Sequence, residues 1–230
     1  MTMTYHHLRL HEQILLLALR DERGTTEGKA GMWRLAFGGA ILAELALEER
    51  IAIDPGKKAF VRVADRSSLG DPVLDDALAR IADAKRPAGA ARWVSRLANL
   101  NLRRESARGL CRRGILHETR DRILFLFTRT CFPTVDPAPE RSLIAAIRAA
   151  VASEDGAVDG RIAALVGVAH AAGTLRVVFD RKTLKARRQR IERLAADHVA
   201  AAATRAAVQA VQTAVMIAAT TAATSSAAAG

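Results

Sequence analysis

The stretch Phe37-Gly-Gly-Ala-Ile-Leu-Ala-Glu-Leu-Ala-Leu-Glu-Glu-Arg-Ile-Ala-Ile53 decides the fold. Its apolar residues recur at the spacing of one broad helical face; they are Ile41, Leu42, Leu45 and Ala46. The acidic residues Glu44, Glu48 and Glu49 are expected to face water. From Ile51 to Ile53 the apolar residues alternate, which is typical of a short strand. The stretch therefore predicts a helix that runs almost directly into a strand.

The length and composition of the whole chain allow one domain of good size or two small ones, with a basic surface. About half of the 230 residues are apolar, which is enough for a sizeable core. The formal net charge is +11 at pH 7. Such a surface favours anionic partners, namely nucleic acid, acidic lipid headgroups or acidic proteins, and the charge alone does not choose among them.

Cysteine usage and the N-terminal residues predict the compartment. Cys111 and Cys131 are far apart and form no CxxC motif, so we expect a reducing compartment and no disulfide framework. The N-terminus has neither the basic region nor the apolar run of a signal peptide. The apolar run from Ile14 to Leu19 is too short to cross a bilayer. We expect a cytoplasmic protein whose membrane contact is peripheral, on the cytosolic face.

Periodicity and capping residues predict a mainly α fold, a single compact helical domain with short β-hairpins. Helices are expected at 8–20, 32–50, from 72 onward, 90–98, 102–113, 139–153, 160–172 and 198–217. Strands are expected at 51–53 and 59–63, and a hairpin around 115–127 is expected from strands at 115–118 and 123–127 with a turn at 119–122. Residues 1–7 are predicted to be an N-terminal arm, 8–217 the domain, and 218–230 a disordered Ala/Thr/Ser tail.

No set of residues forms a convincing catalytic or metal centre. His7 and His11 are four residues apart, but the sequence offers no obvious third ligand. The carboxylates of Asp71, Asp75 and Asp76 are explained by helix capping, since Pro72 suits the first helical position. The glycines of 24–31 are followed by no Gly-Lys-Ser/Thr. We expect no enzyme activity, no cofactor and no metal.

The strongest chemical signal is positive charge. Between Arg92 and Arg129 there are ten arginines and three acidic residues, a local charge of +7, around a helix and an apolar hairpin. In one interpretation this is a winged-helix module that binds nucleic acid. In another, the arginines bind phosphate headgroups while the hairpin enters a bilayer interface. A second basic run, 181–193, is interpreted as a solvated helix face in preference to an anion contact.

Several segments, in order, resemble the Golgi phosphoprotein 3 family in its compact bacterial form. The resemblance covers about residues 8–216. The segments are Leu10-His-Glu-Gln-Ile-Leu-Leu-Leu-Ala-Leu, Gly39-Ala-Ile-Leu-Ala-Glu-Leu-Ala-Leu, Gly70-Asp-Pro-Val-Leu-Asp-Asp-Ala-Leu, Arg113-Gly-Ile-Leu, Leu165-Val-Gly-Val-Ala-His-Ala and Lys185-Ala-Arg-Arg-Gln-Arg-Ile-Glu-Arg-Leu.

The resemblance implies a non-enzymatic peripheral membrane protein that binds phosphatidylinositol 4-phosphate. It implies a headgroup pocket formed here by Trp33, Arg103 and Arg104, while Gly38 and Leu100 stand where the family has two further pocket arginines. The implied membrane-inserting hairpin residues are Ile123, Leu124, Phe125, Leu126 and Phe127. The resemblance also implies possible self-association through the hairpin and possible binding of the cytosolic tails of membrane enzymes. On this interpretation nucleic acid is not the expected partner.

Overall fold

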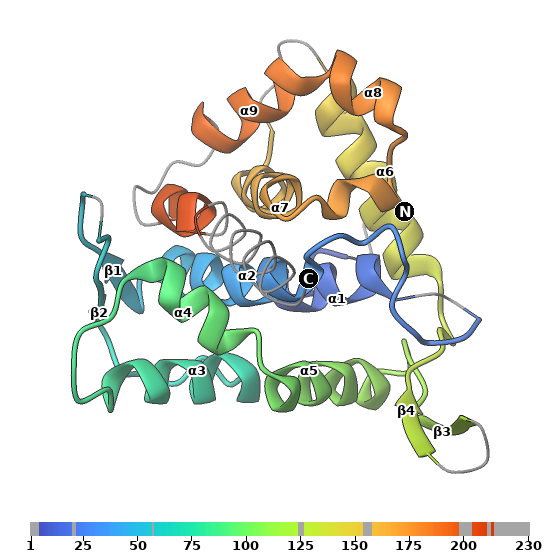
Figure 1. Ribbon diagram of the computed structural model, residues 1–230, viewed down its shortest axis with the longest axis horizontal. Helices are drawn as coiled ribbons and strands as arrows, with labels where there is room; N and C mark the ends of the chain where they lie inside the picture. The colour runs from blue at the N-terminus through green and yellow to red at the C-terminus, as the bar shows by residue number, and fades with distance from the viewer. Residues whose placement is uncertain are drawn as a thin grey trace, which may run out of the picture.

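The computed structural model describes most of the chain. The described residues are 5–19, 22–56, 58–123, 127–153, 158–197, 204–210 and 213. The fold is mainly helical with two small antiparallel two-stranded sheets, which confirms the predicted fold class. Figure 1 shows three layers, with α1 and α2 in the middle, α6–α9 above them and α3–α5 below.

The bounds of the elements follow the chain order. The helices are α1 (Leu10–Ala18), α2 (Trp33–Leu47), α3 (Pro72–Ala82), α4 (Ala90–Leu97), α5 (Leu100–Arg112), α6 (Ala138–Ala152), α7 (Gly160–Ala171), α8 (Arg181–Ala186) and α9 (Arg188–Asp197), with a 3-10 turn η1 (Thr174–Val177). The strands are β1 (Ile51–Ile53), β2 (Val61–Val63), β3 (Thr119–Ile123) and β4 (Phe127–Cys131). Residues 204–210 are also helical.

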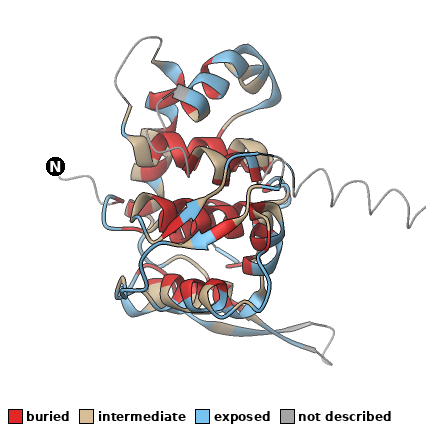
Figure 2. Ribbon diagram, turned by 90° about the vertical axis from the view of Figure 1, so that its left-hand side faces the viewer, coloured by how far each residue is buried: buried red, intermediate tan, exposed pale blue. Residues whose placement is uncertain are grey.

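Helix α2 lies at the centre of the core, in contact with α1, α3, α4 and α7. Residues 36–46 of this helix are all buried, and Figure 2 shows the buried middle layer between more exposed outer helices. Gly38 allows the close approach of α4, because a Cβ atom there would lie 2.1 Å from the carbonyl oxygen of Val94. The organising role predicted for this stretch therefore rests on close helix packing as well as on its apolar face.

The expectation that Glu44 faces water was wrong. Its side chain is 0% exposed, and its carboxylate accepts three hydrogen bonds. The donors are the backbone N–H of Leu10 at 2.7 Å, Nη1 of Arg9 at 3.2 Å and Nη2 of Arg161 at 2.5 Å. A buried carboxylate is tolerated when it is paired and hydrogen-bonded in this way. Glu44 thus joins α2 to the start of α1 and to α7.

Helices α2 and α5 end in the same manner. After each helix one residue has a left-handed backbone, Glu49 with φ 58° and Gly114 with φ 72°. The next N–H then reaches back five residues, from Arg50 to Leu45 at 2.8 Å and from Ile115 to Leu110 at 3.0 Å. This arrangement is a Schellman-type C-cap, and it turns the chain sharply out of each helix.

The second hairpin is present, but its strands lie later in the chain than predicted. Strands β3 and β4 pair with Asp121 opposite Arg129, so the predicted turn at 119–122 is strand. The prediction of a first strand at 115–118 was wrong, because Ile115 and Leu116 are buried in the core directly after the C-cap of α5. The alternating β-branched residues Thr128 and Thr130 favour β4 instead. Residues 124–126, which join the strands, lie outside the described residues.

Candidate functional site

A cavity of about 720 Å³ opens where the end of α1, the loop that follows it, the starts of α2 and α5, and β4 meet. We call it the arginine cavity. Its wall is formed by Leu15, Leu19, Gly24, Thr25, Thr26, Trp33, Arg34, Leu100, Arg103, Arg104, Ala107, Thr128, Arg129, Thr130 and Phe132. The structure therefore brings Trp33, Arg103 and Arg104 together, as the resemblance implied.

The two positions where the family has further arginines differ in the structure. Leu100 lies on the cavity wall, and 48% of it is exposed. Gly38 is not among the lining residues and packs against α4. A side chain at Gly38 would collide with the α4 backbone, so in this chain that position serves packing.

Local structure fixes the positions of the cavity side chains. Helix α2 begins at Trp33, and its N-cap residue Met32 offers no side-chain bond. Helix α5 begins at Leu100, where the Asn99 side chain accepts the N–H of Leu102 at 3.0 Å. The first turns of both helices therefore lie at the cavity. Helix N-termini carry partial positive charge and N–H groups without helical partners, so both favour an anion here.

Arg103 is held on the wall by two contacts. Its guanidinium carbon lies 5.2 Å from the centre of the Trp33 ring, which is within the range of a cation–π contact. Its Nε donates to the carbonyl oxygen of Asn99 at 3.2 Å. These contacts orient the guanidinium and leave it without a carboxylate partner among the described residues.

The cavity has an excess of positive charge. Among the described residues no Asp or Glu lines it, whereas Arg34, Arg103 and Arg104 all do. The pKa of Arg103 is lowered by burial and then by repulsion from Arg34 and Arg104. Arg129, on β4, is paired with Asp121 at 2.8 Å, so its charge is partly neutralised and it adds less to the positive charge of the cavity. An anion placed among Arg34, Arg103 and Arg104 would relieve the repulsion between these side chains.

Sequence reasoning missed Arg34 and Arg129. Arg34 directly follows Trp33 at the start of α2, so its place at the same helix end was a usable signal. Arg129 reaches the wall through the β3–β4 pairing, whose register the sequence did not predict. The wall also includes Thr128 and Thr130, so the hairpin borders the cavity.

The predicted inserting residues are only partly placed. Ile123 ends β3 and Phe127 begins β4. Leu124, Phe125 and Leu126 lie outside the described residues. Membrane insertion of this hairpin therefore stays a prediction.

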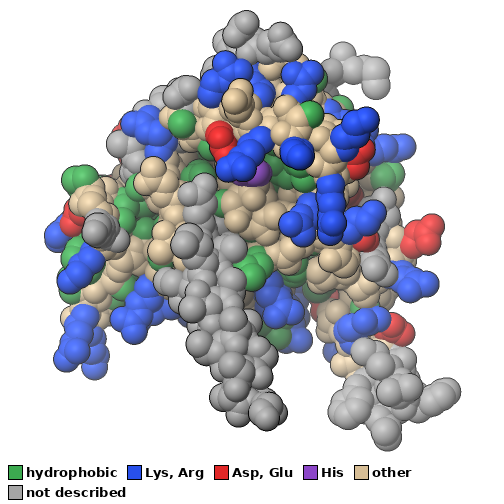
Figure 3. Space-filling view, turned by 45° about the horizontal axis from the view of Figure 1, so that its top comes forward, with side chains coloured by type: hydrophobic (Ala, Val, Ile, Leu, Met, Phe, Trp, Pro, Cys, Tyr) green, Lys and Arg blue, Asp and Glu red, His purple; other side chains and the backbone are tan. Residues whose placement is uncertain are grey.

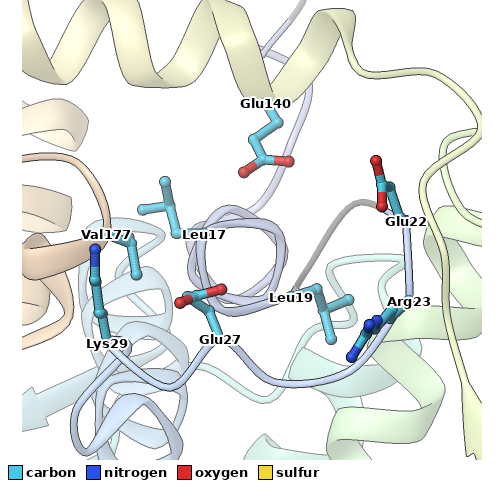
Figure 4. A pocket seen from close by; sticks show the side chains of 8 residues that line it. All are labelled: Leu17, Leu19, Glu22, Arg23, Glu27, Lys29, Glu140 and Val177. Atoms are coloured by element: carbon cyan, nitrogen blue, oxygen red, sulfur yellow. The ribbon is translucent and has the colours of Figure 1, made fainter.

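A neighbouring cavity of about 490 Å³ carries both signs of charge, and we call it the mixed-charge cavity. Figure 4 shows its lining residues, namely Leu17, Leu19, Glu22, Arg23, Glu27, Lys29, Glu140 and Val177. Three carboxylates oppose two cations, and Glu140 points down from α6 toward the loop. The mixed-charge cavity adjoins the arginine cavity, because Leu19 lines both cavities.

His11 lies in a buried polar chain rather than in a metal site. Its Nδ1 lies 2.9 Å from the Ser106 hydroxyl, and its Nε2 lies 3.5 Å from Asp71. Asp71 also accepts the N–H groups of Val73 and Leu74, as predicted for the N-cap of α3. Burial would raise the pKa of Asp71, but its contacts with His11 and the two N–H groups lower it to about 2. These contacts join α1, α3 and α5.

No group of three or more His, Cys, Asp or Glu that could hold a metal ion occurs in the described part of the chain. None of the described helices is long and apolar enough to cross a membrane.

Comparison with known proteins identifies one family. The family model described as Golgi phosphoprotein 3 matches residues 10–211. A curated relative, "Vacuolar protein sorting-associated protein 74" from Eremothecium gossypii, is 29% identical over 157 residues. The alignment covers 59% of this chain and 46% of that protein, so the chain spans about half of the relative's length.

Proposed function

Because the chain belongs to the Golgi phosphoprotein 3 family, we propose that it is a non-enzymatic peripheral membrane protein that binds anionic phospholipid headgroups in the arginine cavity. Phosphatidylinositol 4-phosphate, the lipid that the resemblance implies, is the first candidate. One observation carries the proposal, namely that Arg103, stacked on Trp33, shares a cavity wall with Arg34 and Arg104 and that none of the described lining residues is a carboxylate.

The cavity chemistry suits a phosphate group. Arginine donates paired N–H groups to phosphate oxygens, and each charge-assisted bond contributes about 1.5–3 kcal/mol. Arg103 is already oriented by Trp33 and Asn99, so little side-chain entropy is lost when it binds. The first turns of α2 and α5 add N–H groups and partial positive charge.

The remaining wall suits the apolar part of a lipid. Leu15, Leu19, Leu100 and Phe132 line the cavity beside the arginines. Leu100 is half exposed, so it can meet the glycerol or upper acyl region of a lipid. The hairpin at the cavity edge is proposed to enter the bilayer interface and to allow self-association. We propose that this membrane contact is on the cytosolic face, as the family resemblance implies.

Vesicle sedimentation tests the proposal. We expect the protein to sediment with vesicles that contain phosphatidylinositol 4-phosphate or cardiolipin and to remain in the supernatant when the vesicles are neutral. Arg103→Ala with Arg104→Ala should weaken binding by at least about tenfold. The matched control is Arg108→Ala with Arg112→Ala, since these exposed arginines of α5 lie outside the cavity and pair with Glu118 and Glu105. Equal effects of both variants, or equal binding to neutral vesicles, would overturn the headgroup site.

A second candidate function is that of an adaptor for the cytosolic tails of membrane enzymes. The mixed-charge cavity supports this candidate, because the carboxylates Glu22, Glu27 and Glu140 line it together with the apolar Leu17 and Leu19. A short peptide with basic and leucine residues is the matching ligand. Titration with such a peptide should shift the amide signals of residues 17–29 in the wild type, and Glu140→Gln should weaken the binding. Absence of any shift would remove this candidate.

Nucleic-acid binding is less favoured by the structure. Arg108 and Arg112, on the helix that the winged-helix interpretation would place in a groove, pair with Glu118 at 3.3 Å and Glu105 at 3.1 Å. A gel-shift assay with duplex DNA at low salt tests this alternative. A salt-sensitive shift that is lost on changing Arg103, Arg104 and Arg108 would favour it.

A further inference from the structure

A second cavity with excess positive charge lies at the tip of the loop between α1 and α2. Its volume is about 590 Å³, and we call it the Lys29 cavity. The loop contributes Gly28, Lys29 and Gly31, and η1 with the start of α8 contributes the other side. Those residues are Arg176, Val177, Val178, Phe179, Asp180 and Arg181.

The charges on this wall are poorly balanced. Lys29, Arg176 and Arg181 are exposed, and none of them forms an ion pair within the part of the chain that the structure describes. The one carboxylate on the wall, that of Asp180, is already engaged. It accepts the N–H of Thr183 at 2.6 Å as the N-cap of α8, and this bond lowers the pKa of Asp180.

The excess of positive charge in the Lys29 cavity contrasts with the charge balance of the cavity beside it. The mixed-charge cavity lies next to the Lys29 cavity, since Lys29 and Val177 line both. There three carboxylates oppose the cations, and Figure 4 shows Lys29 beside Val177 at the end away from Glu22 and Arg23. Figure 3 shows Lys and Arg side chains outnumbering acidic ones on the face that includes the layer of α8 and α9. Cations from segments about 150 residues apart in the sequence thus meet at one hollow.

The rest of the wall fits a ligand that is both anionic and partly apolar. Val178 is buried and Phe179 is half-buried, so the wall has an apolar part. The N–H groups of Gly28 and Gly31 donate to no described backbone carbonyl. The side-chain position of Gly31 is filled by the carbonyl oxygen of Ala172, whereas Gly28 is exposed. A phosphate oxygen can therefore approach the loop backbone at Gly28 while the three cations surround it.

We propose that the Lys29 cavity is a second anion site that binds a phosphate ester, in the first place the headgroup phosphate of a second anionic phospholipid. The lipid assignment rests on the proposed function, whereas the phosphate site stands by itself. The two anion sites lie on either side of the mixed-charge cavity, because Leu19 links it to the arginine cavity and Lys29 links it to this one. If one membrane occupies both sites, binding responds to the density of anionic lipid.

The test uses two variants with the same change in net charge. Lys29→Ser, Arg176→Ser and Arg181→Ser are combined in the site variant. Lys182→Ser, Lys185→Ser and Arg193→Ser are combined in the control, since these residues are exposed on α8 and α9 but do not line the cavity. Both are compared with the wild type in two assays, and thermal unfolding checks that each variant is folded.

In the first assay, inorganic phosphate and glycerol 3-phosphate are titrated at constant ionic strength while amide signals are followed by NMR. We expect saturable shifts at Gly28 and Gly31 in the wild type and the control and none in the site variant. In the second assay, binding is measured on vesicles with increasing phosphatidylglycerol content. The site variant should bind at least about fivefold more weakly than the control and with a shallower dependence on lipid content.

The outcomes separate the possible sources of phosphate. Saturable shifts with equal vesicle binding of both variants would assign the site to a free phosphate ester and overturn the lipid source. No shifts together with equal vesicle binding would overturn the site itself. If even the wild type fails to bind vesicles, the proposed function fails, and the phosphate titration still decides the Lys29 cavity.

Discussion

Replacing Leu100 by arginine should strengthen headgroup binding while weakening the unliganded protein. Leu100 lines the arginine cavity and is half exposed, so its loss removes little buried surface. A new arginine at the first position of α5 opposes the helix dipole, at a cost of about 0.3–1 kcal/mol. It also repels Arg103 and Arg104, three and four residues along the helix, by about 0.2–0.5 kcal/mol each. The unliganded variant should therefore lose about 1 kcal/mol of stability.

With a phosphate bound, the same arginine gains a charge-assisted hydrogen bond of about 1.5–3 kcal/mol. Relief of the repulsion adds to this gain, so the affinity for short-chain phosphatidylinositol 4-phosphate should rise at least about tenfold. Calorimetric titration measures the affinity, and urea unfolding without ligand measures the cost. Asn101→Arg is the matched control, since Asn101 is exposed on the same turn but does not line the cavity. Equal affinity gains in both variants would refute the reasoning, as would lower stability of Leu100→Arg without tighter binding.

Three further predictions concern the scaffold. Gly38→Ala should cost about 1–3 kcal/mol in urea unfolding, because its Cβ would lie 2.1 Å from the Val94 carbonyl oxygen; an unchanged midpoint would contradict the close packing of α2 and α4. Glu44→Gln should cost about 2–4 kcal/mol, since it leaves Arg9 and Arg161 without their buried carboxylate; Glu49→Gln, on the exposed end of the turn, is the control and should change little. The pKa of Asp71 is about 2 in the folded protein, against 3.8 in the unfolded chain. Ionised Asp71 therefore contributes about 2 kcal/mol to the free energy of unfolding above pH 4, and this contribution is lost as the pH falls toward 2. Stability of Asp71→Asn, followed from pH 7 to pH 2, should show a correspondingly smaller loss than the wild type; parallel curves would refute this.

The helices were largely predictable because local signals agreed with the tertiary structure. Asp71 and Pro72 mark the start of α3, and Asn99 caps α5, as the sequence indicated. Glu44 was misjudged because its partners Arg9 and Arg161 come from distant parts of the chain. No periodicity in the sequence reveals such a long-range ion pair, so a buried carboxylate on α2 was read as exposed.

The candidate site was predictable only as far as the family resemblance reached. Trp33, Arg103 and Arg104 line one cavity, but Arg34 and Arg129 were found only from the structure. The position of Arg129 on the cavity wall depends on the β3–β4 register. The sequence predicted a different register, because it placed the first strand at Ile115 and Leu116, which are buried in the core. The Lys29 cavity joins the loop after α1 to η1 and α8, a contact that no local pattern indicates.

Binding of a phosphate-bearing headgroup in the arginine cavity can be observed at the arginines themselves, by following their Nε–H signals in NMR while short-chain phosphatidylinositol 4-phosphate is added. We expect saturable shifts at Arg34, Arg103 and Arg104. Small changes are expected at Arg80 and Arg108, which are paired outside the cavity. Uniform small shifts of all arginines, or saturable shifts confined to arginines outside the cavity, would contradict headgroup binding there.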